Sequence, residues 1–397
     1  MSKTNILLLA ICAIAVIGSA GMWYKMKDRF FRPVEKIERW KEQIKDVVPP
    51  RRPERRQTNL QDAINSITLE ELRKDLYYLS SDELEGRMSG KRGNELAAEF
   101  IKNEFEKMGL PTMYDEFQIP RMNIGPKKEM GSNKTRNIYA WIEGNDPVLK
   151  NEVFVIGAHM DHIGYGPRMS RSRFGGIHPG ADDNASGTVA LLEIAEAFSM
   201  MKDKVKRTVV FQAYSGEEMG LLGSRHYVDE PLFPRSNPSI SSHVAMLNMD
   251  MVGWLNKRAS YAVFQNGDSS PDIGRYIGEL NDKYVFANNI TSRASGGSDH
   301  VCFYNKRIPV VFLHTGSHPY YHTTDDTPDK INYTGLQSVA RYAFELSWRI
   351  SQNESKPVFD NTKFKAMSYV HDHGHPEVKF GIEDIQRMMM EIENNDN

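Results

Sequence analysis

The sequence predicts an α/β fold with a mostly parallel, mixed central sheet and helices on both of its faces. Short apolar runs alternate with helical patterns over most of the 397 residues, which is typical of a parallel sheet buried between helices. Acidic and imidazole side chains follow several of these runs, and ligands bind at the carboxyl ends of the strands in such sheets. The chain is long enough for one large domain or two smaller ones.

An apolar segment without any charge, Ile6 to Tyr24, lies near the start of the chain. Its length is close to the roughly 20 residues that a membrane helix requires, and Gly18, Ser19 and Ala20 offer a site for signal cleavage. We therefore expect residues 1–24 to be a transmembrane anchor or a signal segment, which would make the protein membrane-anchored (single pass) or exported. Basic residues follow the segment, and by the positive-inside rule they would keep the body of the protein in the cytoplasm. The side of the membrane on which the folded domain lies stays open.

Three further regions are expected from composition. Residues 25–60 are charged and contain the stretch PPRRPERRQ, which is typical of a linker. Residues 61–355 carry the alternating pattern and should form the folded domain. Residues 356–397 form a polar tail, in which Ile382 to Ile392 could be a helix.

Two helices are expected at the start of the folded domain. Thr68 and Glu71 have capping-box spacing, and the leucines that follow recur with helical period. A second helix should run from Glu95 to Met108 and end at Gly109, because glycine easily adopts the left-handed conformation of a helix C-terminus.

The remaining pattern alternates strands and helices. The expected strands are Asn137 to Ile142, Val153 to Ala158, Thr208 to Tyr214, Val244 to Asn248, Tyr261 to Gln265 and Pro309 to Leu313. The expected helices lie near Gly187 to Met201, Met219 to Val228, Asp272 to Tyr284 and Thr334 to Ile350.

Several classes of function are disfavoured by composition and motifs. The formal net charge of -2 gives no reason to expect nucleic acid as a partner. The two cysteines, Cys12 and Cys302, provide no disulfide framework. The chain has no HExxH motif, which excludes a single-helix zincin site, and no GxSxG motif, which removes the usual serine-hydrolase elbow.

Imidazole and carboxylate groups follow the apolar runs or open the next helix. In chain order they are His159 after VFVIGA, Asp182 and Asp183 in HPGADDNASG, Glu217 and Glu218 after TVVFQAYSG, Asp250 after VAMLNM, and His322 in HPYYHTTDDTPD. This mixture of donors suits zinc and similar divalent ions. Two dications would be neutralised by three carboxylates and a hydroxide, so we expect two divalent metal ions, with zinc preferred.

The motifs GAHMDH, PGADDNASG, SGEEMGLLGS, NMDMVG and YYHTTDDTPD resemble the metal-site motifs of the M28 family of co-catalytic zinc exopeptidases. They occur in the order and with the spacing of that family. The resemblance covers roughly residues 65 to 350, and SSDELEGRMSGKRGNELAAEFI also resembles the start of bacterial members. It implies a zinc-exopeptidase-like sheet and an extracytoplasmic location.

The resemblance implies a set of metal ligands. His159 and Asp250 would bind one ion, Glu218 and His322 would bind the other, and Asp183 would bridge the two. Asp182 is interpreted as a turn residue. Four other histidines are assigned to structural or rim positions: His162, His178, His314 and His318.

The resemblance also implies three catalytic residues. Glu217 would be the general base and acid, and Asp161 would hold the His159 imidazole by its other nitrogen. Tyr321 matches the position of a tyrosine that helps to polarise the substrate carbonyl in some relatives. Other relatives carry that tyrosine shortly before an SDH motif, whereas SGGSDH at 295–300 has none, so the oxyanion donor stays open.

The implied activity is that of an aminopeptidase acting on peptide substrates, with metal-activated water. A carboxypeptidase, a glutaminyl cyclase-like relative with a single zinc, and a non-catalytic receptor-like ectodomain of the same fold remain as alternatives. Oligomeric state is left open by the sequence.

Overall fold

The computed structural model describes residues 58–119, 133–166, 169–172, 175–255, 269–281, 283–284 and 297–367. They belong to the second of two units, which begins at Thr58. The predicted membrane segment 1–24, the strand predicted at 261–265 and the helix predicted at 382–392 lie outside the described residues. Within the described ranges, no helix is both long enough and apolar enough to cross a membrane.

A mixed sheet with strand order β1-β2-β4-β3-β5-β6 forms the centre of the domain. Its strands are β1 Thr112–Gln118, β2 Lys134–Ile142, β3 Val153–His159, β4 Thr208–Tyr214, β5 His243–Met249 and β6 Val310–Leu313. Strands β3 to β6 run parallel to one another, whereas β2 pairs antiparallel with β4 and β1 pairs antiparallel with β2. Every residue of β3, β4 and β5 is buried, as expected for parallel strands covered on both faces.

Most of the helices lie close to the predicted positions, and two short helices, Leu60–Ser66 and His300–Asn305, were not predicted. They are α2 Leu60–Ser66, α3 Leu69–Leu79, α4 Arg92–Lys107, α5 Gly187–Ser199, α6 Leu222–Asp229, α7 Pro271–Asn281, α8 His300–Asn305 and α9 Tyr333–Gln352. The Thr68 side chain accepts a hydrogen bond from the Glu71 backbone at the start of α3, so the predicted N-terminal cap is present. Gly109, two residues beyond α4, has a φ of +74°.

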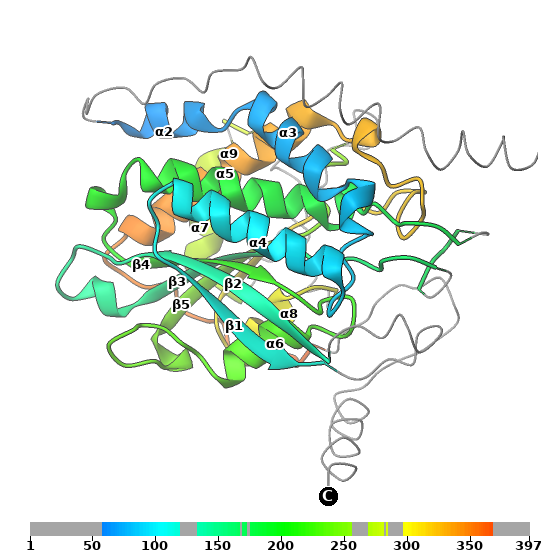
Figure 1. Ribbon diagram of the computed structural model, residues 1–397. Coiled ribbons are helices and arrows are strands. Elements are labelled where there is room, and N and C mark those ends of the chain that lie inside the picture. The colour runs from blue at the N-terminus through cyan, green and yellow to red at the C-terminus, as the bar shows by residue number, and fades with distance from the viewer. Residues whose placement is uncertain are drawn as a thin grey trace, which may run out of the picture. The chain divides into compact units, whose positions relative to one another are not determined.

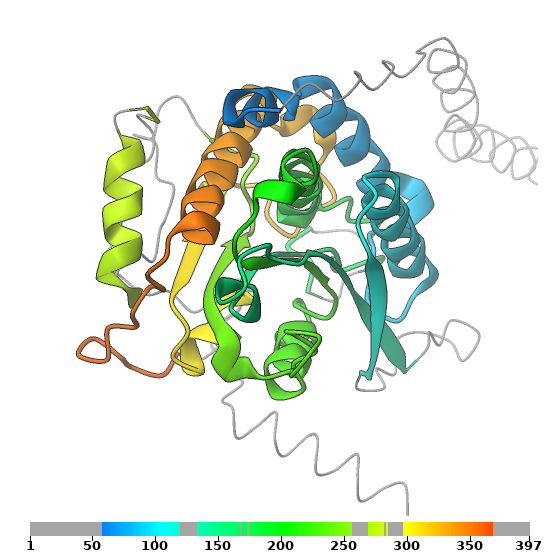
Figure 2. The same ribbon diagram turned by 90° about the vertical axis from the view of Figure 1, so that its left-hand side faces the viewer.

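Helices cover both faces of the sheet, as Figure 1 and Figure 2 show. Helices α3, α4, α5 and α9 pack on one face around a large apolar cluster that contains Phe198 and Phe211. Helices α6 and α8 pack on the other face, around a second cluster that contains Tyr227 and Phe303. The prediction of a mostly parallel mixed sheet between two helical layers is confirmed.

Some elements differ from the prediction. Strand β1 at the sheet edge was not predicted, because Phe117 is its one buried residue and no apolar alternation marks it. Helix α6 begins at Leu222 rather than near Met219. Residues 356–367, assigned to the polar tail, contact the second cluster through Phe359 and Phe364.

The parallel strands direct the site residues to one edge of the sheet. His159 is the last residue of β3, and Asp250 directly follows β5. Glu217 lies three residues after the end of β4, which is hydrogen-bonded to β3. The loops after neighbouring parallel strands therefore deliver these side chains to the same place.

Candidate metal centre

A first group of buried side chains consists of His159, Asp183 and Asp250. Nε2 of His159 lies 3.3 Å from Oδ1 of Asp250 and 3.5 Å from Oδ1 of Asp183. The three side chains come from the end of β3, the segment before α5 and the end of β5. Their donor atoms all lie within 4.8 Å of one another, close enough to hold one cation.

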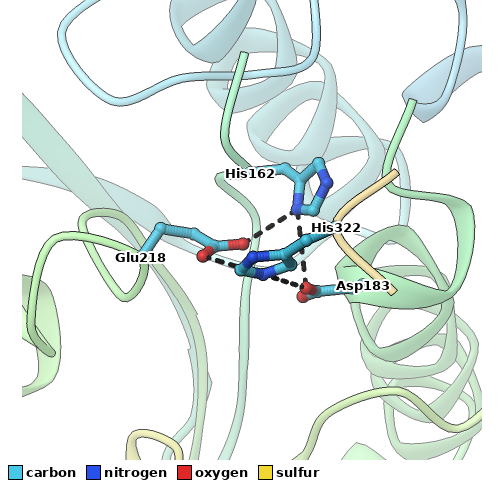
Figure 3. Close-up of side chains that lie close together, drawn as sticks. All are labelled: His162, Asp183, Glu218 and His322. Atoms are coloured by element: carbon cyan, nitrogen blue, oxygen red, sulfur yellow. Dashed lines mark hydrogen bonds and ion pairs between the residues drawn. The ribbon is translucent and has the colours of Figure 1, made fainter. Parts of the chain in front are cut away.

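A second group consists of His162, Asp183, Glu218 and His322, and Figure 3 shows their side chains converging. Nε2 of His322 lies 3.0 Å from Oδ2 of Asp183 and 3.3 Å from Oε2 of Glu218. Nδ1 of His162 lies 2.8 Å from Oε1 of Glu218. The donor atoms of this group likewise all lie within 4.8 Å of one another.

Asp183 belongs to both groups. Its Oδ1 faces His159 and its Oδ2 faces His322. Its backbone N–H, like that of Asp182, donates to the buried carboxylate of Asp326, which fixes the turn before α5. Asp183 is therefore the carboxylate that the two groups share.

The residues present fit divalent metal ions. Three carboxylates, of Asp183, Glu218 and Asp250, are buried in one small region, and burying negative charge is unfavourable unless cations compensate it. Imidazole nitrogen combined with carboxylate oxygen is the donor set that zinc prefers. The geometry is compatible with metal binding at both groups.

The carboxylates raise the pKa of two imidazoles in the site. Burial lowers the pKa of His322, but the carboxylates of Glu218 and Asp183 outweigh this effect and bring the pKa to about 9. The pKa of His159 is likewise lowered by burial but raised well above its ordinary value by Asp250 and Glu217. Ions that bind here must displace these protons.

The structure gives Asp161 a different set of contacts from the predicted one. Nδ1 of His159 lies 3.2 Å from the backbone oxygen of Asp161 and 3.7 Å from its carboxylate. The carboxylate accepts hydrogen bonds from the backbone N–H of Glu217 at 3.2 Å and from the Ser89 hydroxyl at 3.1 Å. Asp161 thus orients His159 through its main chain and Glu217 through its side chain.

Glu217 and Tyr321 both lie beside the two groups. Glu217 is buried and adjoins Glu218 in the loop after β4. The Tyr321 ring stacks on the His322 ring with centroids 4.0 Å apart. Burial and the charges of Asp183 and Glu218 raise the pKa of the Tyr321 hydroxyl well above its ordinary value, so the hydroxyl keeps its proton at neutral pH.

The other residues considered from sequence lie outside the two groups, with one exception. Asp182 accepts from the Gly253 backbone at 2.6 Å and contacts His318 at 3.0 Å. His178 contacts the Gly164 backbone oxygen. The exception is His162, which was assigned to a structural or rim position but lies within the second group. His162 lies beyond the end of β3, so the alternation of side chains along a strand gave no indication of where its ring would lie.

Arg87 is a second residue that the sequence interpretation missed. Its guanidinium is buried and donates to the backbone oxygens of Leu79, Met160, Pro179 and Gly180. Met160 follows His159, and Gly180 precedes Asp183 by three residues. Arg87 therefore ties together the loops that carry the first group, and its place in the SSDELEGRMSG stretch was the available signal.

Comparisons with known proteins show which family this chain resembles. The model of Peptidase family M28 matches residues 137–347. The "Probable leucine aminopeptidase" of Arthroderma otae is 29% identical over 216 residues, which cover 51% of this chain and 56% of that protein. "Aminopeptidase YwaD" of Bacillus subtilis is 26% identical over 242 residues, covering 59% and 49%. The chain thus spans about half the length of these curated relatives.

Solved structures share the fold. "BSAP, a zinc aminopeptidase from Bacillus subtilis" superimposes with a TM-score of 0.60 at 17% identity, covering 77% of this chain and 98% of that one. A glutaminyl cyclase from Bacteroides thetaiotaomicron superimposes with a TM-score of 0.56, also at 17% identity, covering 73% and 99%. At such identities the likeness establishes the architecture alone.

Proposed function

Because this chain belongs to peptidase family M28, we propose that it is a metal-dependent aminopeptidase. The observation that carries the proposal is the pair of buried histidine–carboxylate groups that share Asp183. The names of the relatives support the same activity, since they are aminopeptidases. We propose peptides with a free N-terminus as substrates.

The two groups would hold one divalent ion each, with zinc favoured by the donor set. His159 and Asp250 would bind the first ion, Glu218 and His322 the second, and Asp183 both. When bound, such ions make water more acidic and polarise a carbonyl oxygen.

Glu217 is proposed as the general base and acid. Its carboxylate is buried beside the second group, and its backbone is held by Asp161. In this position it would take the proton from the attacking water and deliver it to the departing amine. Tyr321 would donate its hydroxyl proton in a hydrogen bond to the carbonyl oxygen of the scissile bond, because its raised pKa keeps the hydroxyl protonated.

Peptides blocked at one end distinguish the proposed activity from its alternatives. We expect the zinc-loaded protein to hydrolyse free dipeptides and dipeptide amides, and N-acetylation to abolish hydrolysis. Hydrolysis of N-acetylated dipeptides but not of dipeptide amides would establish a carboxypeptidase. Ammonia release from the side chain of an N-terminal glutamine, with ring closure and without peptide-bond cleavage, would establish a glutaminyl cyclase. Absence of any turnover at full metal loading would favour a receptor-like ectodomain.

Glu217→Gln tests the mechanism. The substitution keeps the size of the side chain but removes the base, so kcat should fall on the order of 10²- to 10⁴-fold. Zinc content, measured by elemental analysis, should stay at the wild-type level because Glu217 is not a proposed ligand. Full turnover in this variant would refute the assigned role.

We also propose that residues 1–24 attach the enzyme to a membrane or direct its export, with the catalytic domain outside the cytoplasm. The support is the charge-free segment from Ile6 to Tyr24 and the family resemblance of the domain. Fractionation of cells that produce the full chain, followed by protease treatment of intact cells, tests this proposal. A full-length product confined to the cytoplasmic fraction would refute it.

A further inference from the structure

The two carboxylate oxygens of Glu218 have different neighbours. Oε2 lies 3.3 Å from Nε2 of His322, in the range found between the other members of the two groups. Oε1 lies 2.8 Å from Nδ1 of His162. Figure 3 shows the Glu218 carboxylate facing both imidazoles, with one oxygen directed at each.

The contact between His162 and Glu218 has the geometry of a hydrogen bond. A nitrogen–oxygen distance of 2.8 Å is typical of a hydrogen bond to a charged acceptor. The same nitrogen is 3.6 Å from Oδ2 of Asp183, too far for a hydrogen bond. In the described part of the chain, Nε2 of His162 has no hydrogen-bond partner, so a proton on Nδ1 is better satisfied than one on Nε2.

The His162 ring is held in place from several directions. Its backbone N–H donates to the Arg87 oxygen at 3.4 Å, and its ring packs edge-on against His322 with centroids 5.5 Å apart. A Cβ atom at Gly180 would lie 2.5 Å from Cδ2 of His162. The ring therefore requires glycine at position 180 and has little freedom to turn away from Glu218.

We infer that His162 is a positioning residue that makes Glu218 a one-oxygen ligand. Its Nδ1–H occupies Oε1, which leaves Oε2 for the ion shared with His322 and Asp183. A carboxylate that binds through one oxygen leaves a coordination position open, and an open position distinguishes catalytic from structural metal sites. The inference rests on the proposed function only in that metal binds at this site.

The main alternative is that His162 binds the ion directly as a further ligand. Two substitutions separate the possibilities. Asparagine places its amide nitrogen close to the position of Nδ1 and can donate to Oε1, but a neutral amide is a poor zinc ligand. Glutamine reaches instead toward the position of Nε2, away from Glu218. His162→Asn should therefore preserve a donor and destroy a ligand.

The experiment uses the full chain with zinc and with cobalt in its place. Zinc affinity is measured by competition with a chelating dye, and cobalt coordination by visible absorption. We expect His162→Asn to keep zinc affinity within about threefold of wild type. We expect His162→Gln to weaken the more weakly bound ion by about tenfold or more. The visible absorption bands of cobalt-loaded His162→Gln should also be weaker than those of the wild type. Glu218 would then bind cobalt through both oxygens, which raises the coordination number of the ion.

His243→Gln is the matched control. His243 is also buried and hydrogen-bonded, to the Tyr227 hydroxyl, but it lies at the opposite end of β5 from Asp250. The His243→Gln substitution should leave the zinc affinity and the cobalt spectrum unchanged.

Two results would overturn the inference. Equal loss of zinc in His162→Asn and His162→Gln would identify His162 as a ligand. Unchanged affinity and spectrum in His162→Gln would show that the hydrogen bond does not govern Glu218. If the metal responses are as expected but the wild type hydrolyses no peptide, the proposed function fails and the inference stands.

Discussion

A single buried guanidinium connects the loops on which the metal centre depends. Arg87 donates to four backbone oxygens, which its planar fork of five donors can serve together. Burial lowers its pKa to about 10, although Asp183 and Asp326 act in the opposite direction. Arg87 therefore stays charged at neutral pH and offsets part of the negative charge of the site.

Substitution of Arg87 should destabilise the domain strongly. Arg87→Met leaves buried carbonyls without these donors, and each unsatisfied group costs about 1–3 kcal/mol, so we expect a total loss of at least about 3 kcal/mol. Arg87→Lys should recover only part of this loss, since an ammonium has three donors. Urea unfolding followed by circular dichroism measures both. Arg92→Met, at an exposed arginine, is the control and should change stability by about 0.5 kcal/mol or less.

At the scale of elements, the contact between α3 and α5 places like charges together. The Glu193 carboxylate on α5 is buried and accepts a hydrogen bond from the Thr68 backbone at 3.0 Å. Glu71 and Glu196 lie close to it. Burial and the charge of Glu71 raise the pKa of Glu193 well above its ordinary value of 4.5.

This arrangement predicts a pH dependence. Above pH 4.5 the unfolded chain releases the Glu193 proton while the folded chain retains it, so stability falls as pH rises toward the folded-state pKa. Glu193→Gln keeps an acceptor for Thr68 and removes the charge, so it should stabilise the domain at pH 8 and have little effect at pH 4. Thermal melting across this range measures the difference.

Glu70→Gln is the control, because Glu70 is exposed on α3. It should leave the pH profile unchanged. A Glu193→Gln variant that is less stable than wild type at pH 8 would contradict the prediction.

The helices and strands differ in how clearly the sequence predicts them. Strands β3, β4 and β5 are buried throughout, so their apolar runs were sufficient to locate them. Strand β1 has one buried residue, Phe117, and α8 has only six residues, so neither carries a periodic signal. The place of β1 is set by its pairing with β2, and the place of α8 by its packing in the second apolar cluster.

The candidate site shows the same division. His159 and Asp250 end strands, where the rule for parallel sheets predicts functional groups. The contact between His162 and Glu218 joins residues 56 positions apart, and the hydrogen bond from Arg87 to Gly180 joins residues 93 positions apart. No local pattern encodes such contacts, because they arise only when the loops are packed together.

At the scale of the whole molecule, the parallel strands bring distant segments to one edge of the sheet. The site extends from His159 to His322 and takes side chains from the loops after β3, β4, β5 and β6. An ion that binds these residues would link loops that the core alone must otherwise hold in place. Metal binding should therefore stabilise the fold as a whole.

Removal of metal should lower the melting temperature of the full chain. An ion that binds the folded state alone stabilises it by about 2.7 kcal/mol when its free concentration is 100 times the Kd. Differential scanning calorimetry with zinc and with a chelator measures the shift. Glu217→Gln should show the same shift as wild type. Equal melting temperatures with zinc and with chelator would contradict metal binding at this site.

The four hydrogen bonds of Arg87 have a consequence for the order in which the nascent protein can mature. Met160, Pro179 and Gly180 follow Arg87 by 73, 92 and 93 positions, so the ribosome completes α3 and α4 long before these partners exist. During that interval the guanidinium must remain hydrated. Water can leave the region around the guanidinium only after translation has passed the turn that contains Asp183. The metal centre can be completed only later, when His322 has also been translated.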